Sequence, residues 1–262
     1  MLSADLLAFY RGLNDRDLTI VDLETTGFAP PMARAIEISI LQASYSGGIQ
    51  QQVTHLINPG VAIPEQITRL TGISGAMVAA AEPAKSVWPQ CFPLLSRGLF
   101  TAHNVSFDYP FVRAELRLQG FEFELPPEER FCSVIFSRLM LPDLPSRSLP
   151  KLVEHFQFNV GRSHRAEADT LACWMLIEEL LHQLNNTEDE VLLKRFGQQW
   201  LTLRDITAIF GQRQSIVQRH LQAADLKPRI SKRTQTIMYQ RSGVEQVFWE
   251  VKGQQGSLLD EV

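Results

Sequence analysis

Short apolar runs separated by turn residues dominate the first hundred residues. Residues 18–24, 36–45 and 51–57 are rich in Ile, Val and Leu, and Gly47 and Gly48 stand between the second and third runs. Runs of this length bounded by Gly are typical of β-strands joined by a tight turn. The run at residues 99–103 has the same character. We therefore expect four strands, with short helical pieces after Pro64.

Helical periodicity appears around and after these runs. Pro83 suits the first position of a helix over residues 83–95, and residues 106–118 predict another. The clearest helix covers residues 166–184, because its apolar residues recur at three- and four-residue spacing. That apolar face consists of Ala168, Leu171, Ala172, Met175, Leu176 and Leu180. Strands interspersed with helices predict an α/β fold.

The chain changes character near residue 187. Residues 185–190 are polar and begin with two Asn residues, which are poor helix formers. Residues 1–190 hold 14 Lys and Arg against 23 Asp and Glu, whereas residues 191–262 hold 11 against 6. We therefore expect two domains, an acidic one over residues 1–187 and a basic one over residues 188–262.

Cysteine usage and hydropathy exclude several classes of protein. Cys91, Cys132 and Cys173 are odd in number and widely spaced, so they predict no disulfide framework and fit a reducing cytoplasm. The chain lacks a run of about twenty apolar residues, and its first residues lack the pattern of a signal peptide. We expect a cytoplasmic protein without a membrane partner.

Two acids stand two positions apart in the first strand. Asp22 and Glu24 are separated by Leu23, so the alternation of a strand directs both carboxylates to the same face. Two carboxylates in an otherwise apolar strand repel each other unless a cation joins them. Mg²⁺ or Mn²⁺ would suit this pair, because both are hard cations that prefer oxygen ligands. A solvated strand end is the alternative interpretation.

Three further segments favour the metal interpretation. Thr25, Thr26 and Gly27 directly follow the acids and offer hydroxyls and a turn beside them. A strand leads through His103, Asn104 and Phe107 to Asp108 at the start of a helix. His164 precedes Asp169 by five residues, and Asp169 lies on the apolar face of the helix over residues 166–184.

These three motifs, in this order and spacing, resemble those of the DEDDh family of 3′→5′ exonucleases, which includes the proofreading epsilon subunit of bacterial DNA polymerase III. The resemblance covers about residues 17–184. It implies a ribonuclease-H-like fold, with a mixed sheet flanked by helices, and two divalent metal ions (Mg²⁺ or Mn²⁺). It implies that the metal ligands are Asp22, Glu24, Asp108 and Asp169. It also implies that His164 is the general base.

The resemblance extends to residues near the terminal nucleotide. Residues 63–73 are similar to the family's segment beside the terminal base, so Leu70 or Ile73 would contact that base. Phe107 would stack or pack nearby, and a core position is the alternative for all three. His103 and Asn104 would hold the substrate strand or the Asp108 loop. Thr25, Thr26 and Gly27 would contact the nucleotide's oxygens.

The basic C-terminal domain has the pattern of two helices joined by a tight turn. Thr202 or Asp205 can cap a helix that ends at Gly211, and Gln214 or Ser215 can open a second one. We interpret this as a helix-turn-helix, winged if residues 236–240 and 244–251 form a hairpin. Its candidate DNA contacts are Arg213, Gln214, Gln218, Arg219, Lys227, Arg229, Lys232 and Arg233. A helix pair that packs on protein is the alternative.

These features predict a 3′→5′ exonuclease that releases nucleoside monophosphates from DNA, most readily from single strands. An RNA-trimming enzyme of the same family and a DNA-binding regulator with an inactive nuclease fold are the alternatives. A last motif suggests a second partner, because it is similar to peptides that dock on bacterial sliding clamps. It consists of Gln255, Gly256, Ser257, Leu258 and Leu259.

Overall fold

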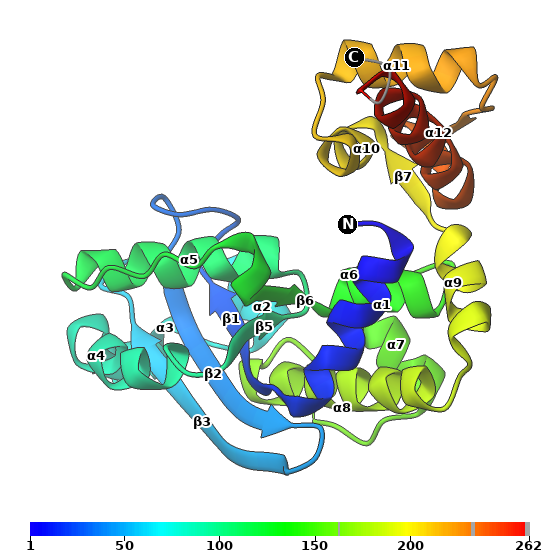
Figure 1. Ribbon diagram of the computed structural model, residues 1–262. Coiled ribbons are helices and arrows are strands. Elements are labelled where there is room, and N and C mark those ends of the chain that lie inside the picture. Colours follow the sequence, from blue (N-terminus) through cyan, green and yellow to red (C-terminus); the bar gives the residue numbers. More distant parts are fainter. Residues whose placement is uncertain (162, 232–233, 260–262) are drawn as a thin grey trace. The chain divides into compact units, whose positions relative to one another are not determined.

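The chain forms two compact units. The computed structural model describes residues 1–161, 163–231 and 234–259, with side chains as far as residue 253 (Figure 1). One unit comprises residues 12–137 and 144–183, and we call it the catalytic unit. The other comprises residues 1–11, 138–143 and 184–262, and we call it the C-terminal unit. The second unit thus includes the first helix of the chain, which the expected division after residue 187 assigns to the first domain.

A six-stranded mixed sheet forms the centre of the catalytic unit. Its strands are β1 (Asp17–Thr25), β2 (Ala35–Ser44), β3 (Gly48–Asn58), β4 (Glu82–Pro83), β5 (Leu99–Ala102) and β6 (Arg130–Cys132). Their order is β4-β3-β2-β1-β5-β6. Strands β1, β2 and β3 are antiparallel, whereas β5 runs parallel to β1 and β6 parallel to β5. The four strands expected from the sequence are all present.

Helices flank this sheet (Figure 1). They are α2 (Glu65–Thr71), α3 (Gly75–Ala79), α4 (Ala84–Leu95), α5 (Val105–Leu118), α7 (Leu149–Phe156) and α8 (Ala166–Asn185), with the 3-10 turns η1 (Gly12–Asp15) and η2 (Pro127–Glu129). Val21 and Leu23 of β1 pack with Trp88 of α4 and Phe111 of α5 in one buried core. The catalytic unit thus has the expected α/β, ribonuclease-H-like fold.

The alternation of β1 turns the two acids away from that core. Asp22 is the Cα partner of Ser39 on β2, and the Ser39 hydroxyl shares a hydrogen bond of 2.9 Å with Thr170 of α8. Directly paired residues of an antiparallel ladder point to the same face. Asp22 and Glu24 therefore lie on the face that α8 covers.

The C-terminal unit combines helices with a small sheet. Its elements are α1 (Ser3–Arg11), α9 (Asp189–Gly197), β7 (Trp200–Thr202), α10 (Leu203–Phe210), α11 (Gln214–Ala223), β8 (Arg229–Ile230), β9 (Ile237–Gln240) and α12 (Arg241–Leu259), and α6 (Ser133–Met140) ends in it. The strands are antiparallel and lie in the order β7-β9-β8. Helices α10 and α11 agree with the two expected helices.

The hairpin expected at residues 236–240 and 244–251 is wrong in its second half. Strand β9 pairs with β7 and β8, and the chain then enters α12 at Arg241. Val244 and Val247 are buried on one side of α12, with Phe248 and Val251 packed beside them. Because these four residues recur at three- and four-residue spacing, they form a helical face rather than the alternating face of a strand.

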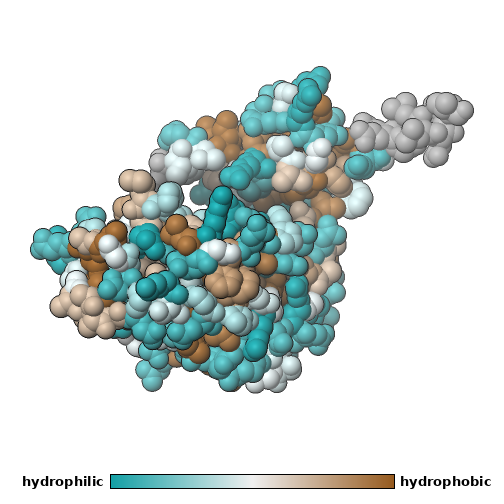
Figure 2. All heavy atoms as spheres, turned by 90° about the vertical axis from the view of Figure 1, so that its left-hand side faces the viewer, coloured by the Kyte–Doolittle hydropathy of each residue, from teal (hydrophilic) through white to brown (hydrophobic). Residues whose placement is uncertain are grey.

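Hydrophilic residues predominate on the face in Figure 2, where hydrophobic residues form small, scattered groups. Among the helices in the described part of the chain, none has both the length and the apolar character that a bilayer crossing requires.

Candidate active site

A cleft of about 250 Å³ opens beside the end of β1. It is lined by Asp22, Leu23, Glu24, Thr25, Gly27, Phe28, Ile67, Leu70, Thr71, Phe107, His164 and Asp169. The lining thus unites the acids of the first strand, the third motif and part of α2. Residues from opposite ends of the catalytic unit's sequence meet here because β1 lies centrally in the sheet.

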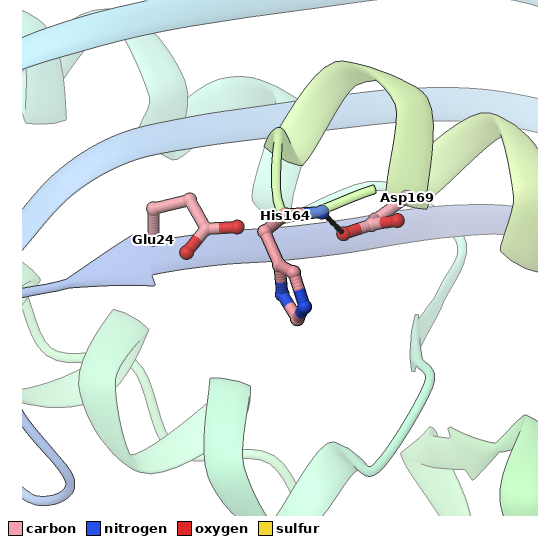
Figure 3. Close-up of side chains that lie close together, drawn as sticks. All are labelled: Glu24, His164 and Asp169. Atoms are coloured by element: carbon pink, nitrogen blue, oxygen red, sulfur yellow. Dashed lines mark hydrogen bonds between the residues drawn. The ribbon is translucent and has the colours of Figure 1, made fainter. Parts of the chain in front are cut away.

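Glu24, His164 and Asp169 lie close enough to share one ion (Figure 3). One ligand atom from each lies within 4.8 Å of the others. The backbone N–H of His164 donates a hydrogen bond of 2.9 Å to Oδ2 of Asp169, and the imidazole points away from that carboxylate. His164 adopts a positive φ of 62°. This left-handed conformation is uncommon outside Gly and is often found at functional sites.

Asp22 and Asp108 complete the acidic group. Burial raises the pKa of Asp22 well above its ordinary value, and the charges of Asp108, Asp169 and Glu24 raise it further. Burial also raises the pKa of Asp108, although hydrogen bonds from backbone amides, including that of Leu23, oppose the rise. Asp108 is 2% exposed, and its Oδ1 atom has no hydrogen-bond partner in the described structure.

Among the four acids, Glu24 has a pKa that burial and its neighbours raise into the range near neutral pH. Burial raises its pKa from 4.5 to about 8, with further contributions from the charges of Asp169 and Glu37, while Arg165 opposes them. The pKa of Asp169 is also raised, first by burial and then by Glu37, against the lowering effect of the His164 amide. The protein alone therefore supplies too little positive charge near these four carboxylates to compensate their negative charges.

This donor set fits divalent cations. Carboxylate oxygens are the ligands that Mg²⁺ and Mn²⁺ prefer, and a buried carboxylate oxygen without a partner, such as Oδ1 of Asp108, is costly unless something binds it. A cation among the four acids would also reverse the rise in their pKa values. The four acids therefore have the chemistry and the burial that divalent cations need from their ligands.

Four of the expected substrate contacts lie in the cleft, namely Thr25, Gly27, Leu70 and Phe107. The Thr25 hydroxyl donates to the carbonyl of Gly27 over 2.6 Å, and Leu70 is half exposed. Thr26 instead closes the loop after β1, because its hydroxyl accepts a hydrogen bond from the backbone N–H of Arg34.

Three other expected contacts have structural roles. Ile73 is 0% exposed and packs with Ile36 and Val78, so it cannot touch a base. The Nε2 atom of His103 donates to the carbonyl of Arg147, and its Nδ1 atom therefore accepts from the Ser133 hydroxyl. Both ring nitrogens are thus occupied by the protein.

Asn104 is the third of these residues. It caps α5 with a φ of 85°, a left-handed conformation that Asn tolerates better than most residues. Its side-chain oxygen accepts a hydrogen bond of 2.8 Å from Ser106. Asn104 therefore shapes the turn that delivers Asp108 to the acidic group.

Sequence reasoning missed several residues of the site. Phe28 is 89% exposed although it lines the cleft, and Ile67 and Thr71 line it from α2. Glu37 is the Cα partner of Glu24 and holds Arg165, which follows His164 directly. Glu37 stands between Ile36 and Ile38, and an acid inside an apolar strand is the signal that singled out Asp22 and Glu24.

The expected DNA contacts of the C-terminal unit are mostly exposed. Gln218 is partly buried, and the exposed residues are Arg213, Gln214, Arg219, Lys227 and Arg229. Lys232 and Arg233 lie outside the described residues. The expected clamp-binding segment falls at the end of α12, where the side chains of Gln255, Gly256, Ser257, Leu258 and Leu259 are not described.

Relatives of known activity match the part of the chain that holds this cleft. The 3′-5′ exonuclease DinG of Bacillus subtilis is 33% identical over 193 residues, which are 72% of this chain and 20% of DinG. The DNA polymerase III epsilon subunit of Aquifex aeolicus is 28% identical over 173 residues, or 66% of this chain and 84% of that subunit. The chain thus spans about a fifth of the length of DinG.

Solved structures share the fold. Exonuclease X in complex with 5′ overhanging duplex DNA has a TM-score of 0.51 and 24% identity, covering 69% of this chain and 99% of that one. The nuclease domain of 3′hExo, a DEDDh family member bound to rAMP, has a TM-score of 0.52 and 17% identity, covering 64% of this chain and 92% of that one.

The family model for exonucleases of the RNase T type matches residues 19–176, which is more than half of the chain and includes Asp22, Glu24, Asp108, His164 and Asp169. The chain belongs to this exonuclease family.

Proposed function

We propose that this protein is a metal-dependent 3′→5′ exonuclease that hydrolyses phosphodiester bonds at the 3′ end of DNA and releases nucleoside monophosphates. The observation that supports this proposal is the convergence of three acids and His164 at one cleft, with the fourth acid, Asp108, buried close enough to raise the pKa of Asp22. A binding protein has no need for carboxylates that raise each other's pKa. The inactive-regulator alternative is therefore disfavoured.

The four acids would hold two divalent ions, Mg²⁺ or Mn²⁺, and such ions when bound stabilise charge on the attacking and leaving oxygens of a phosphate. Asp22 and Glu24 leave β1 toward α8, Asp108 arrives from the start of α5, and Asp169 from the first turn of α8. Because each acid belongs to a regular element rather than to a free loop, the chain keeps the carboxylates in place before substrate arrives.

His164 would act as the general base. Its imidazole is exposed at the cleft and is not hydrogen-bonded to Asp169, whose partner is the His164 backbone N–H. A neutral ring nitrogen can therefore accept a proton from the attacking water. The Glu37–Arg165 pair holds the neighbouring residue, which limits how far the imidazole can move.

The apolar rim of the cleft would hold the terminal nucleotide. Phe28 and Phe107 offer aromatic faces on which a base can stack, and Leu70 offers an apolar contact. The hydroxyl of Thr25 lies beside the acids, near the place where the sugar of a terminal nucleotide would meet the metal ligands. The DNA polymerase subunit among the relatives supports DNA as the substrate, whereas the rAMP bound to the 3′hExo nuclease domain is the reason to test RNA beside it.

The test uses a 5′-labelled single-stranded DNA oligonucleotide with Mg²⁺, Mn²⁺ or EDTA. We expect a shrinking ladder that requires metal and is abolished in Asp22→Asn. Glu128→Gln is the matched control, because Glu128 is an exposed acid on η2, away from the acids that line the cleft. An oligonucleotide that stays intact in both metals would contradict the proposal. A matched RNA oligonucleotide degraded faster than DNA would favour the RNA-trimming alternative.

We also propose a cytoplasmic location and a sliding-clamp contact. The first is supported by the cysteines: Cys91, Cys132 and Cys173 are all free thiols, and reduced cysteines persist in a reducing compartment. The second is supported by the sequence of residues 255–259. A pull-down with a sliding clamp that retains the protein but not Leu258→Ala would support it, and equal retention of both would contradict it.

A further inference from the structure

The C-terminal unit contains a strand, two helices and a hairpin in one small fold. Strand β7 leads into α10, Gly211 turns the chain in the left-handed region at a φ of 63°, and α11 follows after two more residues. Strands β8 and β9 then pair with each other, and β9 also pairs with β7. This order is that of a winged helix-turn-helix, with the hairpin formed by β8 and β9 as the wing.

A single core fixes α11 against the rest of this fold. Val217 and Leu221, one helical turn apart, are both 0% exposed and pack with Ile206 and Phe210 of α10 and Tyr239 of β9. The capping box between Thr202 and Asp205 fixes the start of α10. Helix α11 is therefore held rigidly, with one face turned inward and the opposite face available.

The outward face of α11 carries amide and guanidinium groups. Ser215, Arg219 and Gln222 are exposed at the spacing of one helical face, with Gln218 partly exposed beside them. The helix sequence contains no Asp or Glu. Arg and Gln are the side chains that form paired hydrogen bonds with guanine and adenine in the major groove. Arg213 adds an exposed cation directly before the helix.

The charge near α11 adds to this pattern, although the C-terminal unit as a whole is nearly balanced, with 13 basic and 11 acidic residues over residues 1–11, 138–143 and 184–262. The positive excess lies in residues 191–262, which hold 11 basic against 6 acidic residues. Two of the acids serve the fold itself: Asp205 accepts from Thr202 in the capping box, and Glu245 accepts from Arg241 over 3.2 Å. Arg229 lies over the ring of Trp200 at 5.3 Å, at the start of the wing. Arg213, Arg219 and Arg229 thus remain exposed, whereas Lys227 is paired with Asp225 over 2.5 Å.

From this arrangement we propose that the C-terminal unit binds duplex DNA, with α11 in the major groove. A B-form major groove admits a helix, whereas the deep and narrow major groove of duplex RNA does not. The sequence of α11, the helix proposed for the groove, contains no Phe, Tyr or Trp on which single-stranded bases could stack. This binding does not depend on the acidic cleft.

The test measures binding by full-length protein in EDTA, so that no substrate is cleaved. The probes are a labelled blunt duplex, its single strand and a duplex RNA of the same sequence. We expect the duplex DNA to bind most tightly. The double variant Arg213→Ala and Arg219→Ala should bind it about tenfold or more weakly, with a smaller dependence of affinity on salt, because two contacts to the duplex are lost.

Lys194→Ala with Lys252→Ala is the charge-matched control, since both lysines are exposed on other helices of the same unit. Equal melting temperatures of the two double variants exclude unfolding as the cause. An equal loss of affinity in the control, unchanged affinity in the arginine variant, or preference for single strands or RNA would each overturn the proposal. Because turnover is not measured, its failure is distinguishable from failure of the proposed nuclease.

Discussion

Glu37 holds Arg165 through both of its carboxylate oxygens. Nη2 of Arg165 lies 2.6 Å from Oε1 of Glu37, and the backbone N–H of Ala166 donates to Oε2 over 2.9 Å. Glu37 is buried and is the Cα partner of Glu24. The pair thus neutralises the carboxylate of Glu37, which lies opposite the acidic group. It also fixes Arg165, the residue after His164, and so joins the β1–β2 ladder to the third motif.

Replacing Glu37 should therefore lower kcat more than it raises KM. In Glu37→Gln, Arg165 loses its ionic partner and the His164 segment gains freedom, so we expect kcat to fall by about tenfold or more. The free energy of unfolding should fall by about 1–3 kcal/mol, less than for a fully buried pair, because the Arg165 side chain is 39% exposed. Single-turnover kinetics and urea unfolding measure the two effects. An unchanged kcat would contradict the positioning role.

A second buried pair supplies the matched comparison. Glu115 accepts from Nε and Nη2 of Arg34 and from the backbone N–H of Ala35, at 2.8, 2.9 and 3.0 Å. Arg34 closes the loop that begins at Thr26 and carries Phe28. We therefore expect Glu115→Gln to cost similar stability but to act chiefly on KM, with kcat largely kept. Equal losses of kcat in both variants would show that the two pairs are merely structural.

His164 should be needed for chemistry and not for metal binding by the acids. We expect His164→Ala to lower kcat by about 10²–10⁴-fold, the range usual for loss of a general base. The loss should persist at saturating Mn²⁺, where the acids already hold metal. Isothermal titration with Mn²⁺ checks that the four acids still bind. A variant that keeps the wild-type kcat would assign the base to another group.

How far the sequence predicts this site depends on what each pattern encodes. Asp22, Glu24 and Asp169 could be predicted because a charge inside an apolar strand or on an apolar helix face contradicts its local pattern. Glu37 carries the same signal, yet its role depends on Arg165, which is distant in sequence. That pairing is set by where the segment before α8 meets β2, and no local pattern encodes this contact.

Apolar residues near the site were harder to assign. Ile73 is buried and Phe28 is exposed, although both are large apolar residues beside Gly and turn-forming segments. Which of them faces solvent is decided by packing of the loop against α2 and β2, not by hydrophobicity. The expected hairpin at residues 236–240 and 244–251 shows the same limit, because residues 244–251 alternate enough to suggest a strand, whereas the core of the C-terminal unit selects the helical face of α12.

The metal-free protein should lose stability as pH rises toward 8. The pKa of Glu24 is raised from 4.5 to about 8 in the folded state, so between these values the folded state binds more protons than the unfolded state. The free energy of unfolding then falls as pH increases through this window. In EDTA we expect the melting temperature to drop between pH 5 and about 8, and to drop less in Glu24→Gln.

Metal should reverse this loss. Cations bind the deprotonated acids, so Mn²⁺ should raise the melting temperature more at pH 8 than at pH 6. Differential scanning fluorimetry at both pH values measures this, with Glu128→Gln as the control acid. Equal stabilisation at the two pH values would mean that the acids are already ionised without metal, contrary to the raised pKa values.

Phe28 should contribute to substrate binding without contributing to stability. It is 89% exposed and lines the cleft, whereas Met32, in the same connection between β1 and β2, is 93% exposed and does not line it. We expect Phe28→Ala to leave the melting temperature unchanged and to raise KM for single-stranded DNA by about 5–150-fold, which corresponds to one base stack of about 1–3 kcal/mol. Met32→Ala, which removes a similar exposed apolar side chain, should change neither quantity. Steady-state kinetics on one oligonucleotide separate the two variants, and an equal rise of KM in both would attribute the effect to the loop rather than to stacking on Phe28.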